Sequence, residues 1–250
     1  MVDFKQSMSV SKNYMKDGSE SWQILKEEYD RYLGSTNDIQ KIPKIIHQVW
    51  IGGKMPDKEK RLCDEWKDEC KKQGWEYMFW GNEEVKQYEI RNNNIFERTK
   101  SVGQKSDIIR LQILEDYGGV YLDTDFKYIK MFDDKMLTLD FFAGLTYDKK
   151  PVIMNSLIGS SGGNELICHL NEIEEISYHN AMEVIRTTGP YYLTDKYFKS
   201  EMGNKCIFPV TYFFPFSNKP HDKVKGNNYQ NYIKGETNCV HLWNCSWMVK

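Results

Sequence analysis

Two aspartates separated by one residue follow an apolar segment in the middle of the chain: Asp123 and Asp125 come directly after residues 120–122. Carboxylates placed in this way lie at the edge of a sheet. Mn²⁺ or Mg²⁺ is commonly held by one or two carboxylates together with substrate phosphates, and the bound ion neutralises a departing diphosphate. The same residues also suit a solvated turn. The motif alone therefore leaves a metal site and a turn both open.

A second charged pair, Asp107 and Arg110, lies just before this segment. A spacing of three residues puts both side chains on one face of a helix. They form either a simple ion pair within the helix, worth about 0.3–0.5 kcal/mol, or part of a site. In a site, Arg110 would contact a phosphate or a sugar hydroxyl, and Asp107 would accept hydrogen bonds from sugar hydroxyls.

The elements that must position these residues alternate between extended and helical patterns. Strands are expected at residues 45–51, 75–80, 120–122, 140–145 and 152–158. Helices are expected at 19–33, after Pro56, from Asn82, and at about 99–117, 163–176 and 180–186. The alternation predicts an α/β domain with a mostly parallel central sheet. Residues 196–250 are aromatic and loop-rich and give no clear pattern.

Two of the expected strands carry candidate site residues at their carboxyl ends, Trp50 on one and Asp123 on the other. Ligands of such sheets bind at the carboxyl ends of the strands, so these ends are expected to face one cleft. The helix at 99–117 ends at Gly118, where a left-handed C-cap is predicted. Residues 1–40 are expected to form a helical extension that packs on a main domain of residues 41–250.

The composition narrows the class of partner. Hydrophobic residues make up 40% of the chain and charged residues 28%, and the net charge is −2, which gives no reason to expect nucleic acid or an anionic membrane as the main partner. No apolar stretch reaches the roughly 20 residues that span a bilayer, and the polar start does not resemble a signal peptide. A soluble, cytoplasmic protein is expected. The six scattered cysteines predict neither a zinc site nor a disulfide framework.

Two segments resemble the signatures of the family 32 glycosyltransferases, which contain the DXD motif. They are residues 42–52, with the sequence IPKIIHQVWIG, and residues 106–125, from Ser106 to Asp125. This family includes yeast-type initiating mannosyltransferases and bacterial capsular polysaccharide transferases. The first segment is also similar to the glucosyltransferase domains of the large clostridial toxins. The resemblance covers about residues 41–130, is loose over 141–190, and does not extend to residues 1–38.

The resemblance implies a GT-A fold, a nucleotide-sugar donor, Mn²⁺ with Mg²⁺ as the alternative, and retention of the anomeric configuration. A UDP-hexose is the preferred donor and GDP-mannose the second. The acceptor is expected to be a glycan, such as a growing surface polysaccharide, or a protein hydroxyl. No carboxylate is clearly placed as a covalent nucleophile, which favours substitution from the same face as the leaving group.

The resemblance also implies roles for residues that would contact the donor. Val49 and Trp50 hold the nucleotide base, with Trp50 stacking on it. Asp107 and Arg110 bind the donor sugar, so the resemblance favours the site over the simple ion pair. Tyr121 lines the donor pocket.

The metal site follows from the same resemblance. Asp125 is the direct metal ligand, and Asp123 contacts both the ribose and the metal. Asn155 falls where the family often has a polar residue near the donor sugar.

The end of the chain resembles the family's closing segment, which folds over the diphosphate. Ser246 and Trp247 would contact the β-phosphate and order this segment. His241 would supply a neutral imidazole to the metal, although a buried histidine among tryptophans explains it equally well. His47 lies inside a buried strand, where a core histidine is favoured over a general base. Residues 188–190 resemble an acceptor-side turn and also suit an ordinary loop.

Two other classes of protein compete with the transferase. Aspartyl phosphatases of the haloacid dehalogenase type also use two aspartates after a strand. They need Thr or Val two residues past the second aspartate, where this chain has Lys127. A sugar- or nucleotide-binding module without turnover is the other alternative. The complete pairs Asp123 with Asp125 and Asp107 with Arg110 argue against it.

Overall fold

The computed structural model describes residues 2–8, 18–146, 148, 150–174, 176, 181–217 and 228–244. Within these residues the helices are α1 (Phe4–Met8), α2 (Glu20–Gly34), α3 (Asp57–Gln73), α4 (Asn82–Gln87), α5 (Asn93–Arg98), α6 (Val102–Tyr117), α7 (Glu165–Asn171), α8 (Ala181–Thr187) and α9 (Pro190–Lys199). The strands are β1 (Ile45–Val49), β2 (Glu76–Trp80), β3 (Gly119–Leu122), β4 (Phe126–Tyr128), β5 (Phe141–Leu145), β6 (Ile153–Ser160), β7 (Lys205–Phe208) and β8 (Cys239–His241). Short 3₁₀ turns cover Met136–Thr138, Val210–Tyr212 and Asn228–Tyr232.

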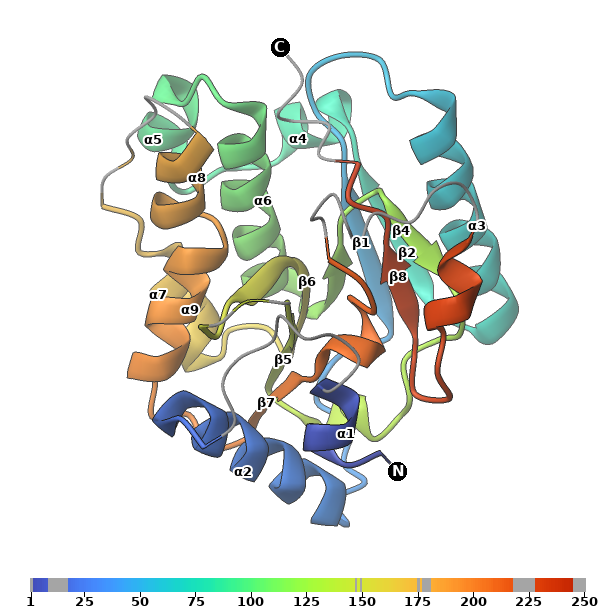
Figure 1. Ribbon diagram of the computed structural model, residues 1–250. Helices are drawn as coiled ribbons and strands as arrows, with labels where there is room; N and C mark the ends of the chain where they lie inside the picture. The colour runs from blue at the N-terminus through green and yellow to red at the C-terminus, as the bar shows by residue number, and fades with distance from the viewer. Residues whose placement is uncertain are drawn as a thin grey trace.

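In the described part of the chain, six strands form one sheet in the order β2-β1-β3-β6-β5-β7 (Figure 1). β2, β1 and β3 run parallel, and β5 and β7 run parallel. β6 is antiparallel to both of its neighbours, β3 and β5, so it alone reverses the common direction among these six. The predicted α/β class with a mostly parallel central sheet is therefore confirmed.

The pairing of β1 with β3 brings the strand ends that carry Trp50 and Asp123 together. Ile46 pairs with Val120 and His47 with Tyr121 in parallel register. Because parallel neighbours end at the same edge of a sheet, Trp50 and Asp123 lie at one edge, as expected. β1 itself ends at Val49, two residues earlier than predicted.

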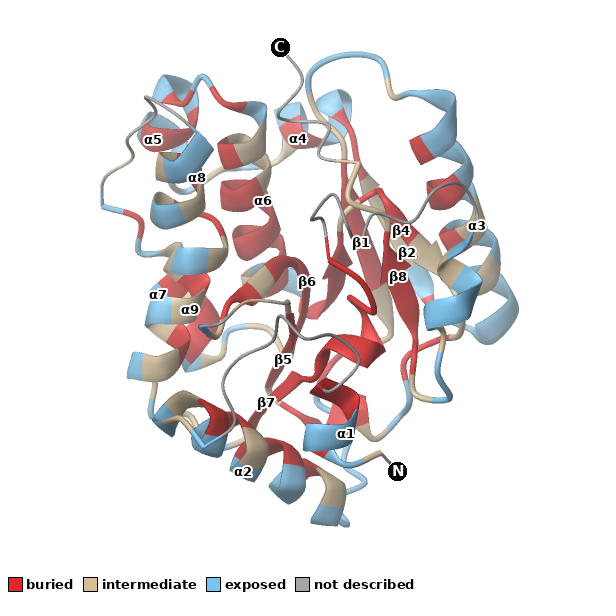
Figure 2. Ribbon diagram, in the orientation of Figure 1, coloured by how far each residue is buried: buried red, intermediate tan, exposed pale blue. Residues whose placement is uncertain are grey.

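Helices pack on the sheet and present their apolar sides to it. α3 packs on β2 and β4, α6 packs on β1, β3 and β6, and α9 packs on β6. Figure 2 shows β3, β5, β6 and β7 almost entirely buried, while β2 and β4 are partly exposed and the outer faces of α3 and α7 are exposed. Leu62, Cys63, Trp66 and Cys70 form the buried side of α3, the helix expected after Pro56. No helix among the described residues is both long and apolar enough to cross a bilayer.

The glycines after α6 allow the chain to pass from helix to strand in a tight space. Gly118 caps α6 with φ 64° and ψ −159°, so the predicted left-handed C-cap is wrong in ψ although φ is positive. A Cβ on Gly118 would lie 2.9 Å from Cδ of Pro43, and one on Gly119 would lie 2.8 Å from the carbonyl oxygen of Ile45. Both positions require glycine, because residues with a side chain rarely adopt positive φ and neither position has room for a Cβ atom.

The last third of the chain contains regular elements that the sequence pattern did not predict. β7 extends the main sheet beside β5, and β8 pairs with β4 in a separate two-stranded sheet, where His241 lies opposite Phe126. These strands are three or four residues long, too short to show a period in the sequence. The helix predicted at 163–176 is also shorter, because α7 ends at Asn171.

The N-terminal helix forms where it was predicted. The Ser19 hydroxyl caps α2 by accepting a hydrogen bond from the backbone N–H of Trp22. Trp22, Leu25 and Tyr29 are buried on one face. This face packs on β7, and the Tyr29 hydroxyl lies 2.9 Å from that of Tyr212. The described N-terminal residues are thus continuous with the main core.

Candidate active site

Asp123, Asp125 and His241 come together at the carboxyl edge of the sheet. Asp123 follows β3 directly, and its backbone N–H donates to the Ser156 carbonyl at 2.8 Å. Asp125 precedes β4, whose pairing with β8 carries His241 to the aspartates. The three side chains each offer a ligand atom, and these atoms lie within 4.8 Å of one another. The arrangement joins residues from distant parts of the sequence.

The three donors have the chemistry of a divalent metal site. His241 Nε2 lies 3.0 Å from Asp125 Oδ1, and both residues are buried, at 6% and 8% exposed. His241 Nδ1 is buried and has no hydrogen-bond partner among the described residues. A buried imidazole with an unused nitrogen beside two carboxylates fits a cation. The imidazole favours a transition ion such as Mn²⁺ over Mg²⁺, which prefers oxygen ligands.

The two aspartates differ electrostatically. Burial raises the pKa of Asp123, and the charge of Asp125 raises it further against the opposing attraction of Arg110. Burial alone would also raise the pKa of Asp125. The His241 imidazole and the backbone N–H of Asn244 outweigh burial and hold that pKa below its usual value. Asp125 is therefore the more firmly ionised of the two carboxylates.

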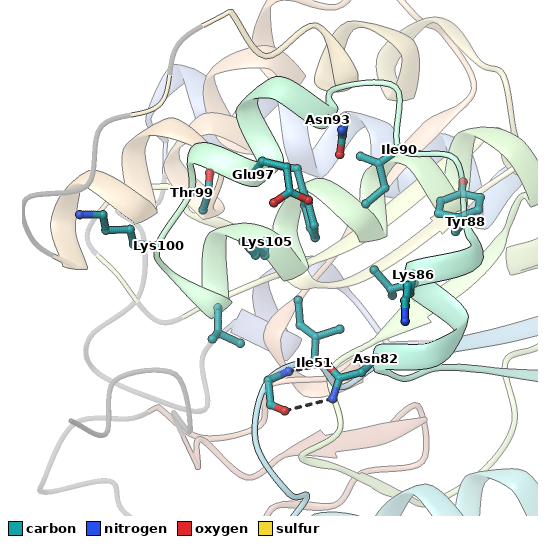
Figure 3. Close-up of a pocket in the computed structure, with 14 residues that line it drawn as sticks. Ile51, Asn82, Lys86, Tyr88, Ile90, Asn93, Glu97, Thr99, Lys100 and Lys105 are labelled. Carbon is teal, nitrogen blue, oxygen red and sulfur yellow. Dashed lines mark hydrogen bonds between the residues drawn. The ribbon is translucent and has the colours of Figure 1, made fainter.

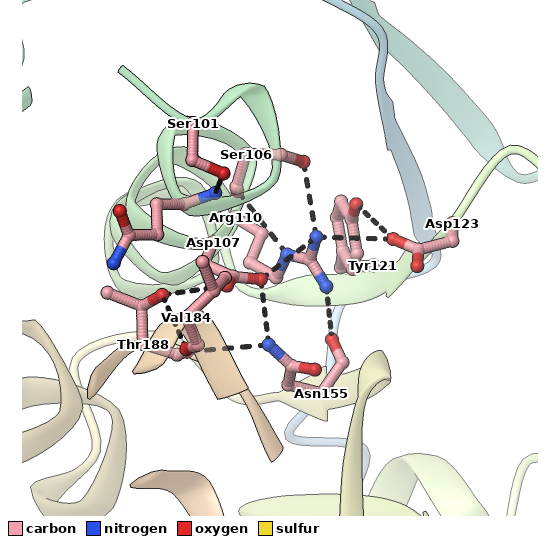
Figure 4. A network of polar contacts seen from close by, with 10 residues as sticks. Ser101, Ser106, Asp107, Arg110, Tyr121, Asp123, Asn155, Val184 and Thr188 are labelled. Carbon is pink, nitrogen blue, oxygen red and sulfur yellow. Dashed lines mark hydrogen bonds and ion pairs between the residues drawn. The ribbon is translucent and has the colours of Figure 1, made fainter. Parts of the chain in front are cut away.

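Arg110 lies at the centre of a buried polar network next to the aspartates (Figure 4). Its guanidinium is 3.2 Å from Asp107 Oδ1 and 3.3 Å from Asp123 Oδ1. It also donates to the carbonyl of Asn155 at 2.7 Å and to the hydroxyl of Ser106 at 3.1 Å. Arg110 is only 5% exposed. Its contact with Asp123 links α6 to the end of β3.

Asp107 is held on the other side of this network. Its two oxygens accept hydrogen bonds from the Asn155 amide and the Thr188 hydroxyl, each at 2.8 Å. Burial raises the pKa of Asp107 to about 6, although Arg110 and the Thr188 hydrogen bond oppose this rise. Asp107 is thus a buried carboxylate with three partners, and its pair with Arg110 is not an exposed ion pair. It joins α6, β6 and the end of α8.

Tyr121 contacts both Arg110 and Asp123 in this polar network. It is fully buried in β3, and the guanidinium of Arg110 lies 4.5 Å from the centre of its ring. The Tyr121 hydroxyl donates to Asp123 Oδ1 at 2.6 Å. The Tyr121 phenol and the Arg110 guanidinium therefore both hold Asp123 in place.

A pocket of about 690 Å³ opens beside the end of β1 (Figure 3). Its walls come from the β1 end, α4, α5 and the start of α6, and they include Ile51, Gly52, Phe96 and Val102. The volume lies within the range of pockets that hold small molecules. Trp50 is half-buried next to this pocket but does not line it, and its indole N–H donates to Gly53 at 2.9 Å. Val49 is 5% exposed.

Residues 56–141 match the model of a family described as a glycosyltransferase sugar-binding region containing a DXD motif. The match covers about a third of the chain, so it is a resemblance of this region to the DXD-containing glycosyltransferases. The matched region includes Asp107, Arg110, Asp123 and Asp125, whereas Trp50 and His241 lie outside it. The predicted family resemblance is therefore confirmed.

Several individual proteins are similar to this chain over part of their length. An uncharacterized glycosyltransferase of Acanthamoeba polyphaga mimivirus is 30% identical over 161 residues, which cover 59% of this chain and 61% of that protein. Inositol phosphoceramide mannosyltransferase 1 of Schizosaccharomyces pombe is 30% identical over 97 residues, which cover 35% and 29% respectively. The chain thus spans less than two thirds of either relative. A solved glycosyltransferase involved in glycosylation of the major capsid of PBCV-1 aligns with a TM-score of 0.49 at 13% identity, covering 82% of this chain and 95% of that one.

His47 lies in the core of the protein. It is fully buried, its Nε2 lies 2.9 Å from the Gly118 carbonyl, and its Nδ1 accepts from the indole of Trp80 at 3.2 Å. Burial lowers the pKa of His47 to about 4, although the Gly118 carbonyl opposes this. Both ring nitrogens are used by the protein. Full burial and the use of both nitrogens fit a core histidine, which is the interpretation that the sequence favoured.

Ser246 and Trp247 lie outside the described residues. The sequence did not point to Gln48, whose amide donates to the Asp123 carbonyl at 3.2 Å and whose oxygen accepts from Tyr77 at 2.8 Å. A glutamine inside an apolar strand was the available signal, because a buried amide needs partners. Asn244 was also missed, and no local pattern marks it.

Proposed function

We propose that the protein transfers a hexose from a nucleotide-sugar donor to a hydroxyl of a glycan or protein, with retention of configuration. Mn²⁺ would be held by Asp123, Asp125 and His241. The observation that carries this proposal is the convergence of these three side chains within 4.8 Å, next to the buried guanidinium of Arg110. A GT-A architecture, with residues 1–40 as an extension and 41–250 as the transferase domain, is part of the proposal.

The donor would lie along the carboxyl edge of the sheet. The base is assigned to the end of β1, where Val49, Trp50 and the adjacent pocket are found. The diphosphate would lie near Asp125, and the sugar near Asp107 and Asn155. Ser246 and Trp247 would close over the diphosphate. A bound Mn²⁺ supplies positive charge that stabilises the departing nucleoside diphosphate.

The chain's own residues would orient the donor for substitution on one face. The acceptor oxygen forms a bond to the anomeric carbon while the bond from that carbon to the diphosphate oxygen breaks. The electron pair leaves with the diphosphate, and a phosphate oxygen takes the acceptor proton. Asp107 is engaged by Asn155, Thr188 and Arg110, which supports a positioning role over that of a covalent nucleophile.

The test is donor hydrolysis and transfer with purified protein. UDP-hexoses and GDP-mannose are incubated with Mn²⁺, Mg²⁺ or EDTA, and nucleoside diphosphate is measured. GDP-mannose is included because an inositol phosphoceramide mannosyltransferase is among the relatives. We expect Mn²⁺-dependent release that is lost in Asp125→Asn. No binding or cleavage of any nucleotide sugar with any divalent ion would refute the proposal.

The same assay separates the alternatives. Donor binding without turnover, even with acceptor glycans present, would indicate a binding module. Hydrolysis of simple phosphate monoesters through a phospho-aspartate would indicate a phosphatase. The nucleophile of such a phosphatase would be the first aspartate, Asp123, and its Oδ1 is already engaged by the Tyr121 hydroxyl and the Arg110 guanidinium, which argues against this role. The expected cytoplasmic location stays part of the proposal, and fractionation of producing cells would test it.

A further inference from the structure

The segment after β8 turns back on Asp125 through an unusual backbone conformation. Trp243 has φ 55°, a region that bulky residues rarely adopt. Its indole N–H donates to the Phe216 carbonyl at 2.9 Å, and its ring packs edge-on against His241 with centres 4.3 Å apart. A strained residue persists where its surroundings over-determine it, and such residues cluster at functional sites.

This turn aims two backbone N–H groups at one aspartate. The N–H of Leu242 donates to the Asp125 carbonyl at 3.0 Å. The N–H of Asn244 donates to Asp125 Oδ2 at 2.8 Å. The other carboxylate oxygen, Oδ1, lies 3.0 Å from His241 Nε2. Both oxygens of Asp125 therefore have a partner, and the contact from Asn244 fixes which oxygen faces the imidazole.

The side chain of Asn244 is in turn held by the first turn of α3. Its amide nitrogen donates to Glu59 Oε1 at 2.8 Å, and its amide oxygen accepts from Lys58 Nζ at 2.6 Å. Glu59 is 6% exposed, so this hydrogen bond is anchored in the protein rather than in solvent. One side chain thus connects the start of α3 to the carboxylate of Asp125.

We propose that Asn244 is a positioning residue for the metal site, held by Lys58 and Glu59 so that its N–H fixes the rotation of the Asp125 carboxylate. This inference rests on the proposed function, in which Asp125 ligates Mn²⁺. Carboxylates that bind metals are usually hydrogen-bonded by outer partners, and losing such a partner typically weakens metal binding about 10–100-fold. Asn244 and Glu59 would have this effect without touching the ion.

The test measures Mn²⁺ affinity of the full chain by electron paramagnetic resonance, with no nucleotide sugar present. Asn244→Ala and Glu59→Ala should each weaken binding about tenfold. Glu59→Gln keeps an amide oxygen that accepts from Asn244, so it should restore most of the affinity. Lys60→Ala removes an exposed ion pair with Asp64 on the same helix and is the matched control, with affinity unchanged.

The double variant Asn244→Ala with Glu59→Ala distinguishes a connected pair from two separate effects. If the pair acts as one unit, the double variant binds Mn²⁺ no more weakly than either single variant. Wild-type affinity in Asn244→Ala would overturn the inference, as would a loss that Glu59→Gln shares in full. A lower melting temperature of the metal-free protein with unchanged affinity would also overturn it, because the contact would then be only structural.

Failure of the proposed function would look different. In that case the wild-type chain itself binds no Mn²⁺, or Asp125→Asn binds it as well as the wild type. If wild type binds and Asp125→Asn does not, the metal site stands whatever the outcome for Asn244.

Discussion

His241 Nε2 lies 3.0 Å from Asp125 Oδ1, a contact made by the antiparallel pairing of β4 with β8. Neither strand is long, so the contact depends on the last described part of the chain closing against the segment after β3. It also places an imidazole nitrogen beside two carboxylates. The side chain of His241 is therefore the most direct means of testing the metal assignment.

His241→Ala should weaken Mn²⁺ binding by at least tenfold, because a ligand is lost and the effect should be no smaller than that of removing an outer partner. Isothermal titration calorimetry would measure the affinity. The matched control is His169→Ala, since His169 is an exposed histidine elsewhere in the chain. Equal affinity in His241→Ala and wild type would show that the imidazole is a core residue and no ligand.

Arg110 lies between the buried carboxylate of Asp107 and the half-buried carboxylate of Asp123, so removing it should destabilise the fold. In Arg110→Met, Asp107 and Asp123 lose their shared cation, and we expect the free energy of unfolding to fall by about 3 kcal/mol. Urea denaturation of the metal-free protein would measure it. Adding Asp123→Asn should recover part of the loss, because the two changes act on one network. Strict additivity of the two effects would contradict this reading of the network.

The central part of the fold could be predicted from the sequence because its signals are local. The run that ends at Val49 and the glycines after α6 each mark the end of an element within a few residues. The C-terminal part could not be predicted in this way. β7 and β8 are short and owe their conformation to partners far along the chain, β5 and β4.

The candidate site, like the fold, could be predicted only where its signals are local in the sequence. Asp107, Arg110, Asp123 and Asp125 were found because they lie within one short stretch and in a recognisable motif. The contacts between these residues could not be predicted from the sequence, because Arg110 reaches Asp123 only through the packing of α6 on β3. Asn244 makes its contacts through a positive φ at the preceding tryptophan, which no propensity predicts.

His47 makes the stability of the protein depend on pH. Its pKa is lowered by burial to about 4 in the folded state, against about 6.5 when unfolded. The unfolded chain therefore binds the proton more readily, so stability is lost as the pH falls from about 6.5 towards 4. Protonating Nδ1 would remove the acceptor of the Trp80 indole. Between pH 7 and 5 the free energy of unfolding should fall by about 2 kcal/mol from this residue alone.

The check is urea denaturation at both pH values with His47→Gln and His169→Ala beside the wild type. His47→Gln should be less stable at pH 7 but should lose less on acidification. His169→Ala should keep the wild-type pH dependence. An unchanged pH dependence in His47→Gln would assign the acid sensitivity to other groups.

Filling the pocket beside β1 should weaken donor binding if the nucleotide base lies at this strand end. Val102 is 46% exposed, lines the pocket and lies 3.5 Å from the position that a Cβ on Gly52 would take. In Val102→Trp the larger ring would occupy the space beside the strand end. We expect KM for the nucleotide sugar to rise about tenfold, which corresponds to about 1.4 kcal/mol of lost binding, while kcat and the melting temperature change little. Ile39→Trp is the control, because Ile39 is 68% exposed and does not line the pocket. A Val102→Trp enzyme with the wild-type KM would place the base elsewhere along the edge of the sheet.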